Sequence, residues 1–101
     1  MILYLDTTDF NNLRFAVADA QGKQRSQTFR LDSHQSTKTV ALLEKFLKTN
    51  KIAGSNVKQI VINKGPGSYT GVRVGMAMAM ALFLAWGAKV RPVAASKFRI
   101  Q

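Results

Sequence analysis

A glycine-rich stretch at residues 65–75 is the strongest constraint on how this chain folds. Its sequence, Gly-Pro-Gly-Ser-Tyr-Thr-Gly-Val-Arg-Val-Gly, places four glycines and one proline between two apolar segments. Each glycine loses more backbone freedom on folding than any other residue, so such stretches occur where the backbone turns sharply or approaches another group closely. The stretch therefore predicts a tight turn or a close approach of the backbone to a ligand.

The segments on either side of this stretch predict a buried strand and an apolar helix. Residues 57–62 end in three contiguous β-branched residues, which is typical of a strand buried on both faces. Residues 72–86 are apolar on nearly every side, and their alternating methionines and alanines have high helix propensity. Such a helix must be covered by its own sheet and by something else. The apolar run 74–86 is too short to predict a membrane span.

The rest of the chain predicts more strands and a second helix. Apolar residues alternate along 13–17, as in a half-buried strand, and recur at helical spacing between 40 and 47. The predicted elements are strands at 2–6, 13–18 and 23–30, a hairpin turn at 19–22, a helix after the N-cap candidates of 32–37 that ends between Asn50 and Gly54, and a strand at 89–94.

This order, β-β-β-α-β-α-β, predicts one α/β domain over residues 1–101. Three strands joined by hairpins and followed by right-handed α crossovers form a mixed sheet with helices packed against it. The arrangement is ribonuclease H-like, and it also forms one lobe of an actin-like ATPase. Those ATPases have two such lobes with nucleotide between them, whereas this sequence predicts one.

The charge of the chain is unevenly distributed. The formal net charge is +10, and residues 45–101 hold ten basic side chains and no acidic one. This asymmetry indicates a polyanionic partner such as RNA, an acidic protein surface, or a basic surface that serves solubility. The chain has no cysteine, so a disulfide or a thiolate zinc site is excluded. Its first six residues lack the features of a signal peptide.

The glycine stretch does not match the known phosphate-binding fingerprints. A Walker A loop ends in Gly-Lys-Ser/Thr, but here Val72 follows Gly71, and the spacing of the dinucleotide fingerprint is also absent. Backbone N–H groups at the start of a helix still bind anions. Ser68, Tyr69 and Thr70 could add hydroxyl donors there, and Arg73 a positive charge. The alternative is a tight strand-to-helix turn, in which Gly71 and Gly75 let the helix pack closely.

Other chemical candidates are weaker. Asp6-Thr7-Thr8, after the first strand, could organise a metal and phosphate or could form an Asx-type turn that needs no ligand. His34 is the only histidine, so a histidine pair for a metal is excluded. Ser68 lacks the Gly-x-Ser-x-Gly elbow of a serine hydrolase. The outward half of the apolar helix instead suits packing against another subunit.

Two of these motifs resemble the TsaB family. TsaB proteins act in bacterial tRNA threonylcarbamoyladenosine biosynthesis and belong to the glycoprotease-like family of the actin-like ATPase superfamily. The resemblance rests on Asp6-Thr7-Thr8 and on residues 65–73 before an apolar helix. The family loop usually reads Gly-Pro-Gly-Ser-Phe-Thr-Gly-hydrophobic-Arg, so this chain has Tyr69 where the family has Phe. The resemblance covers all 101 residues and the N-terminal lobe of a typical member.

The resemblance implies a non-catalytic accessory subunit in the cytoplasm. Family members pair with a TsaD-type catalytic subunit through the two helices of the N-terminal lobe, and a small TsaE-type ATPase joins them. The complex transfers a threonylcarbamoyl group to the adenosine next to the anticodon of certain tRNAs. ATP, ADP and Mg²⁺ would enter only through the wider complex, and the chain alone would form a homodimer through the same helices.

Two sets of residues follow from the motifs and the resemblance. The expected remnant of an anion or nucleotide site comprises Asp6, Thr7, Thr8, Gly65, Gly67, Ser68, Thr70, Gly71 and Arg73, and no metal ligand is expected. The expected partner interface comprises Val40, Leu43, Leu47, Val74, Met76, Ala77, Met80, Ala81 and Leu84.

Two other functions stay open on the sequence alone. One is the nucleotide-binding lobe of an actin-like phosphotransferase, which would use Asp6 and the glycine stretch. The other is a basic RNA-binding module that uses residues 45–101, although the chain has no stripe of aromatic residues for base stacking.

Overall fold

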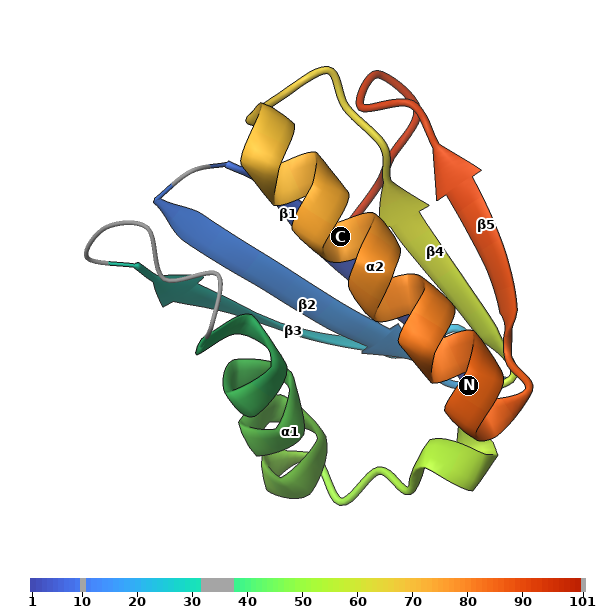
Figure 1. The fold of residues 1–101 in the computed structure, drawn as a ribbon. Coiled ribbons are helices and arrows are strands. Elements are labelled where there is room, and N and C mark those ends of the chain that lie inside the picture. The colour runs from blue at the N-terminus through green and yellow to red at the C-terminus, as the bar shows by residue number, and fades with distance from the viewer. Residues whose placement is uncertain (10, 32–37, 101) are drawn as a thin grey trace.

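The computed structural model describes residues 1–9, 11–31 and 38–100, which form one α/β lobe (Figure 1). The N-cap candidates at 32–37, including His34, lie outside these residues. The elements are β1 (Ile2–Asp9), β2 (Asn12–Ala18), β3 (Gln24–Arg30), α1 (Thr39–Thr49), the short 3-10 helix η2 (Gly54–Asn56), β4 (Gln59–Asn63), α2 (Tyr69–Trp86) and β5 (Lys89–Val93).

The five strands form one mixed sheet in the order β3-β2-β1-β4-β5. β2 runs antiparallel to both β1 and β3, whereas β1–β4 and β4–β5 are parallel pairs. Tight turns explain the antiparallel part: Asp19 accepts hydrogen bonds within the β2–β3 turn, where Gly22 has a φ of 81°. The predicted mixed sheet and the order of its elements are confirmed.

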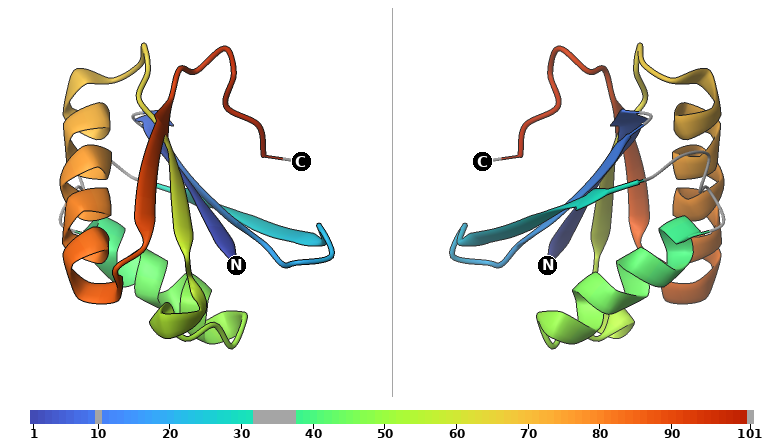
Figure 2. Two further views of the ribbon diagram at one scale, coloured as in Figure 1. Left: turned by 90° about the vertical axis from the view of Figure 1, so that its right-hand side faces the viewer. Right: turned by 90° about the vertical axis from the view of Figure 1, so that its left-hand side faces the viewer.

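Both helices cover the same face of the sheet. The crossover from β3 to β4 contains α1, and the crossover from β4 to β5 contains α2, and both step across the sheet in the same direction. Because such crossovers are right-handed, both helices must lie on one side. Figure 2 shows α2 on one side of the sheet and the C-terminal segment on the other.

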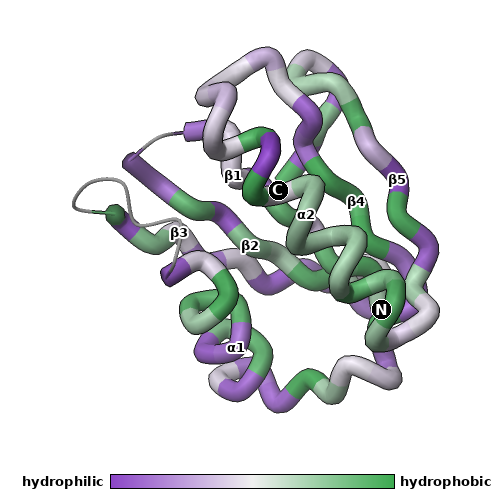
Figure 3. Tube along the Cα trace, viewed as in Figure 1, coloured by the Kyte–Doolittle hydropathy of each residue, from purple (hydrophilic) through white to green (hydrophobic). Residues whose placement is uncertain are grey.

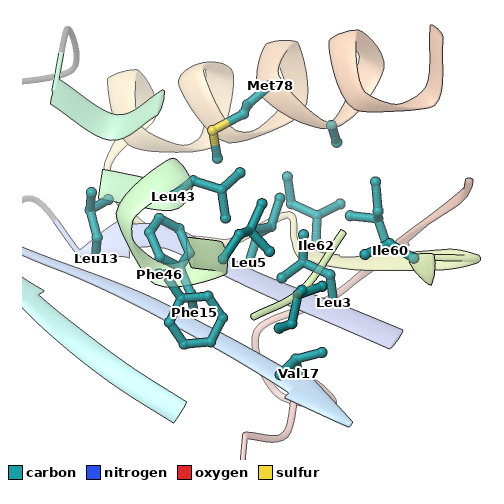
Figure 4. Close-up of a cluster of buried hydrophobic side chains, with 14 of the residues drawn as sticks. Leu3, Leu5, Leu13, Phe15, Val17, Leu43, Phe46, Ile60, Ile62 and Met78 are labelled. Carbon is teal, nitrogen blue, oxygen red and sulfur yellow. The ribbon is translucent and has the colours of Figure 1, made fainter. Parts of the chain in front are cut away.

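The hydrophobic core lies between the sheet and the two helices (Figure 4). Alternate residues of the strands, including Leu5 and Phe15, point toward the helices and are fully buried. The Phe46 ring of α1 packs on Phe15 with ring centroids 6.0 Å apart, and Met78 of α2 joins the same cluster. The strand β4 has buried residues on both faces, as its β-branched run predicts.

The opposite face of the sheet is covered in part by the C-terminal segment. Phe98 is buried there, and its ring meets Tyr4 of β1 edge-on, with centroids 6.2 Å apart. The amide of Ala95 donates to the Gly65 carbonyl, which joins this segment to the glycine-rich loop. The segment that follows β5 is therefore attached both to the sheet, through Phe98, and to the glycine-rich loop, through Ala95.

The helix α2 begins at Tyr69, three residues before the predicted start. Ser68 is its N-cap, and the Ser68 hydroxyl accepts a hydrogen bond from the Gly71 amide, so the loop itself supplies the cap. Gly87, with a φ of 70°, ends the helix as predicted. At 18 residues, α2 is long and apolar enough to cross a membrane by length and composition, although it packs on the sheet here. Figure 3 shows that α2 is hydrophobic beyond its first turns, whereas hydrophilic and hydrophobic residues alternate along α1.

Candidate functional site

The end of β1 and the glycine-rich loop lie against each other at the carboxyl ends of the parallel strands. The Ser68 amide donates to the Thr8 carbonyl at 2.7 Å. Gly67 is so close to β1 that an added methyl group would lie 2.6 Å from the Thr8 Cβ. The structure therefore brings together the two motifs that the sequence singled out, Asp6-Thr7-Thr8 and the stretch that follows β4.

Two glycines of α2 pack directly on Thr7. The Thr7 side chain is 2% exposed, and its hydroxyl donates to the Gly71 carbonyl at 2.7 Å. A Cβ on Gly71 would overlap the Thr7 carbonyl oxygen, and one on Gly75 would overlap the Thr7 hydroxyl and press on Ile62. These glycines let the helix approach the strand at backbone distance, which confirms the predicted close packing of Gly71 and Gly75.

The polar groups of the loop bind one another. The Gly65 amide donates to the Asn63 side chain at 2.9 Å, the Ser68 amide to Thr8, and the Gly71 amide to the Ser68 hydroxyl at 3.1 Å. A phosphate cradle needs such amides free to point at the ligand. Three amides of the loop thus already donate hydrogen bonds within the protein. We call the loop a brace, because it connects β1 to α2 through these bonds.

Asp6 is likewise occupied locally. One oxygen of its carboxylate accepts from the Thr8 amide at 3.1 Å and from the Thr8 hydroxyl at 2.7 Å. This is the Asx-type turn that the sequence left as the alternative to a metal and phosphate site. Within the described residues, no buried side-chain nitrogen or oxygen lacks a hydrogen-bond partner, and no group of three acidic or histidine side chains could hold a metal ion.

Asn63 belongs to this cluster although the sequence reasoning missed it. The side chain is buried, accepts from the Gly65 amide and donates to the Thr8 hydroxyl at 3.5 Å. It therefore connects β4, the loop and β1. The sequence did carry a signal: Asn63 directly follows the buried apolar run 60–62, and a buried polar side chain must find hydrogen-bond partners.

Arg73 and Thr70 lie on the exposed side of α2. The Arg73 guanidinium donates to the Tyr69 hydroxyl at 3.2 Å and stands over the Tyr69 ring, 5.5 Å from its centroid. Thr70 is exposed in the first turn. Arg73 thus contacts Tyr69 of its own helix through both the ring and the hydroxyl.

The outward side of α2 is mostly apolar and carries one charge. We call the residues that share this side the outer face of α2. With a turn of about 100° per residue, their side chains point within about 60° of one common direction around the helix axis. The members are Thr70, Arg73, Ala77, Met80, Ala81 and Leu84. Leu84 is 79% exposed and Met80 52%, which is unusual for large apolar side chains in a helix that packs on a sheet.

The expected partner interface is only partly at the surface. Ala77, Met80, Ala81 and Leu84 are exposed, as is Val40 of α1, while Val74 and Met76 are half-buried. Leu43 and Leu47 are corrected by the structure, because they are 2% and 8% exposed and lie in the core. The helical period of α1 points them at the sheet together with Phe46, so they cannot also face a partner. Phe83, which is exposed, was not predicted.

At the edge of the cluster, Asp9 closes the turn between β1 and β2. Its carboxylate accepts from the Asn11 amide at 2.8 Å and from the Asn12 side chain at 3.2 Å. These hydrogen bonds favour the charged form, so they lower the pKa of Asp9 below its ordinary value of 3.8. Asp9 therefore has a structural part in the hairpin.

Comparison with known proteins identifies the family. The family model described as TsaD, tRNA N6-adenosine threonylcarbamoyltransferase, matches residues 31–98. The chain is 31% identical over 94 residues to the tRNA threonylcarbamoyladenosine biosynthesis protein TsaB of Bacillus subtilis. It is 33% identical over 79 residues to an uncharacterised protein of Mycoplasma pneumoniae, the MG208 homolog. These alignments cover 93% and 76% of this chain, and 39% and 40% of the two relatives.

Solved structures agree with this assignment. YeaZ from Pseudomonas aeruginosa superposes with a TM-score of 0.80 at 25% identity, over 92% of this chain and 42% of that one. A second structure, of a protein described as similar to the peptidase YeaZ from the same organism, gives a TM-score of 0.81 with the same coverage. The chain spans about two fifths of the length of these relatives. The motifs, the actin-like lobe and these matches show that the chain belongs to the TsaD family and is TsaB-like.

Proposed function

We propose that this chain is a non-catalytic partner subunit in the synthesis of threonylcarbamoyladenosine in tRNA, and that it binds a TsaD-type catalytic subunit. The observation that carries the proposal is the outer face of α2. A helix that is hydrophobic on all sides exposes Met80 and Leu84 to solvent, and such surfaces mark protein–protein interaction sites. The matches to the TsaD family model and to the Bacillus subtilis TsaB protein support a role in this tRNA modification.

The structure of the face suits helix-on-helix packing. Ala77 and Ala81 are small and lie one turn apart at its centre, so a partner helix can approach closely. Met80 and Leu84 beside them provide apolar area, and methionine adapts to an irregular partner surface. Val40, 54% exposed on α1, extends the apolar surface toward the second helix of the lobe.

The other subunits of the complex carry out the chemistry. The transfer chemistry, with ATP, ADP and Mg²⁺, belongs to the TsaD-type subunit and to a TsaE-type ATPase. Alone, the chain uses the same face for a homodimer. In the cytoplasm, the basic residues of 45–101 contact tRNA or an acidic surface of the complex.

Co-purification with a TsaD-type subunit of the same organism tests the proposal. The double variant Ala77→Arg, Ala81→Arg places two long charged side chains at the centre of the face. We expect it to weaken binding on the order of 100-fold, as truncating a central interface residue does. The matched control is Ala20→Arg, Ala53→Arg, which adds the same charge at two exposed alanines outside both helices. Equal binding by both double variants would place the interface elsewhere.

The nucleotide-binding alternative has its own test. Three of the amides that could hold a phosphate, those of Gly65, Ser68 and Gly71, are bonded to Asn63, Thr8 and Ser68. Calorimetric titration of the chain with ATP and Mg²⁺ should therefore give no heat of binding at millimolar ligand. If ATP binds and the Asp6→Ala variant abolishes that binding, the result would favour the phosphotransferase hypothesis over the accessory role.

A further inference from the structure

We infer that the outer face of α2 prefers a partner helix that carries a carboxylate. Arg73, positioned by its contacts with Tyr69, would bind this carboxylate. The inference rests on the proposed function, since it names the chemistry of the partner at the same face. A second copy of the chain is the competing occupant of the face.

Arg73 is the one charged residue between Tyr69 and Trp86, and it lies on the outer face. It is two turns before Met80, so the face has an apolar half and a cationic end. A partner helix that lies along α2 and covers Met80 and Leu84 also covers Arg73, because the three residues lie on one side of the helix. The interface must therefore accommodate a guanidinium group.

The guanidinium is oriented but its charge is not neutralised. Tyr69 is 75% exposed, and it offers its ring face and its hydroxyl to the guanidinium. A guanidinium carries five N–H donors, and the Tyr69 hydroxyl accepts from only one nitrogen. Within the described parts of the chain, no carboxylate lies within ion-pair distance of Arg73. Most of its hydrogen-bonding capacity is thus directed to solvent.

Covering such a group requires an acceptor from the partner. A buried charge without a counter-charge is strongly unfavourable, whereas a carboxylate pairs with a guanidinium through two parallel hydrogen bonds. Because Tyr69 restricts the Arg73 side chain, less conformational entropy is lost when that pair forms. A phenylalanine at position 69 would keep the ring contact but lose the hydroxyl. The hydrogen bond from Arg73 to the Tyr69 hydroxyl therefore fixes the orientation of the guanidinium.

A second copy supplies this acceptor poorly. Residues 45–101 contain no acidic side chain, and each copy carries a net charge of +10. Pairing α2 with α2 of another copy brings two Arg73 groups into one interface without a carboxylate from either helix. The one acidic residue on the helices is Glu44, which is exposed on α1. Charge complementarity therefore favours a different protein with an acidic residue on its facing helix.

The experiment is a set of dissociation constants for the TsaD-type subunit, with self-association measured in parallel by sedimentation. We expect Arg73→Gln to weaken binding of the subunit about 10- to 100-fold and to reduce the salt dependence of the affinity. Tyr69→Phe should weaken it about threefold, the effect of one neutral hydrogen bond. Both side chains are exposed, so thermal unfolding of the two variants should match the parent chain.

Three outcomes would overturn the inference. If Ala77→Arg, Ala81→Arg abolishes binding but Arg73→Gln does not change it, the proposed function stands and the carboxylate recognition fails. If none of these variants changes binding, both fail. If the homodimer is at least as tight as the heterologous complex, and Glu44→Gln weakens that homodimer as much as Arg73→Gln does, the carboxylate comes from a second copy.

Discussion

At the scale of single residues, the glycines of the loop and of α2 are explained by what they touch. Gly67 faces Thr8, and Gly71 and Gly75 face Thr7, so three of the four glycines in the stretch adjoin one short segment of β1. The hydroxyl of Thr7 then bonds the Gly71 carbonyl. A stretch that looks like a phosphate cradle in sequence is a strand-to-helix brace in the fold.

The close contact of the glycines with β1 predicts that replacing them with alanine destabilises the fold, which is the opposite of the usual effect in a helix. In an ordinary helix, Gly→Ala stabilises by about 1 kcal/mol. Here Gly71→Ala or Gly75→Ala should lower the free energy of unfolding by about 1–3 kcal/mol, because the new methyl group overlaps Thr7. Denaturant unfolding measures this change. Thr70→Ala, an exposed change in the same turn, is the control and should stay near the parent; a stabilising Gly75→Ala would contradict the packing.

At the scale of elements, the two helices differ in how they use their apolar residues. In α1 the apolar side points at the sheet, so Leu43, Phe46 and Leu47 are in the core and little remains for a partner. In α2 the sheet takes Gly75, Met78 and Ala79, and large apolar residues are left outside. The interface is therefore proposed mainly on α2, with Val40 as the contribution of α1.

A pair of leucine truncations separates these two positions. Leu43→Ala should lower the free energy of unfolding by about 2–5 kcal/mol, because it leaves a cavity in the core. Leu84→Ala should change it by less than about 0.5 kcal/mol, since the side chain is exposed, and should weaken binding of the partner instead. Thermal unfolding and a binding titration on the same two variants give both values. A destabilised Leu84→Ala chain would contradict the exposure of the outer face.

The sequence predicted the elements well and the site less well, for a physical reason. The order and type of the elements follow from local periodicity, and the residue types also predicted the hairpin turn at 19–22 and the end of α2 at Gly87. The start of α2 was not, because it depends on the Ser68 cap. Which apolar residues of α1 face inward depends on where the sheet lies, and a periodic pattern alone does not show that. The place of Arg73 likewise depends on its neighbour Tyr69.

At the scale of the whole molecule, the direction of both crossovers puts both helices on one face (Figure 2). The lobe thereby presents a helical side, with the outer face of α2, and a sheet side on which the C-terminal segment packs through Phe98. The glycine-rich loop lies at the end of the sheet, bonded to both β1 and the segment after β5.

The net charge gives a prediction for tRNA at this scale. Basic residues are spread over α1, the loops and β5 as well as α2, so phosphate contacts would be diffuse. We expect any affinity of the chain alone for tRNA to fall steeply between about 50 and 200 mM salt, because phosphate contacts release counterions. Filter binding at the two salt concentrations measures this. Tight binding that is insensitive to salt would instead indicate specific recognition.

The central claim is that the outer face of α2 holds a TsaD-type partner. The most direct measurement is the mass of the complex in solution by light scattering, for the chain alone and mixed with the TsaD-type subunit. We predict a mixed complex that forms with the parent chain and with Ala20→Arg, Ala53→Arg, and that is lost with Ala77→Arg, Ala81→Arg. A mixture that runs as separate components for the parent chain, or a complex that survives the Ala77 and Ala81 changes, would contradict the claim.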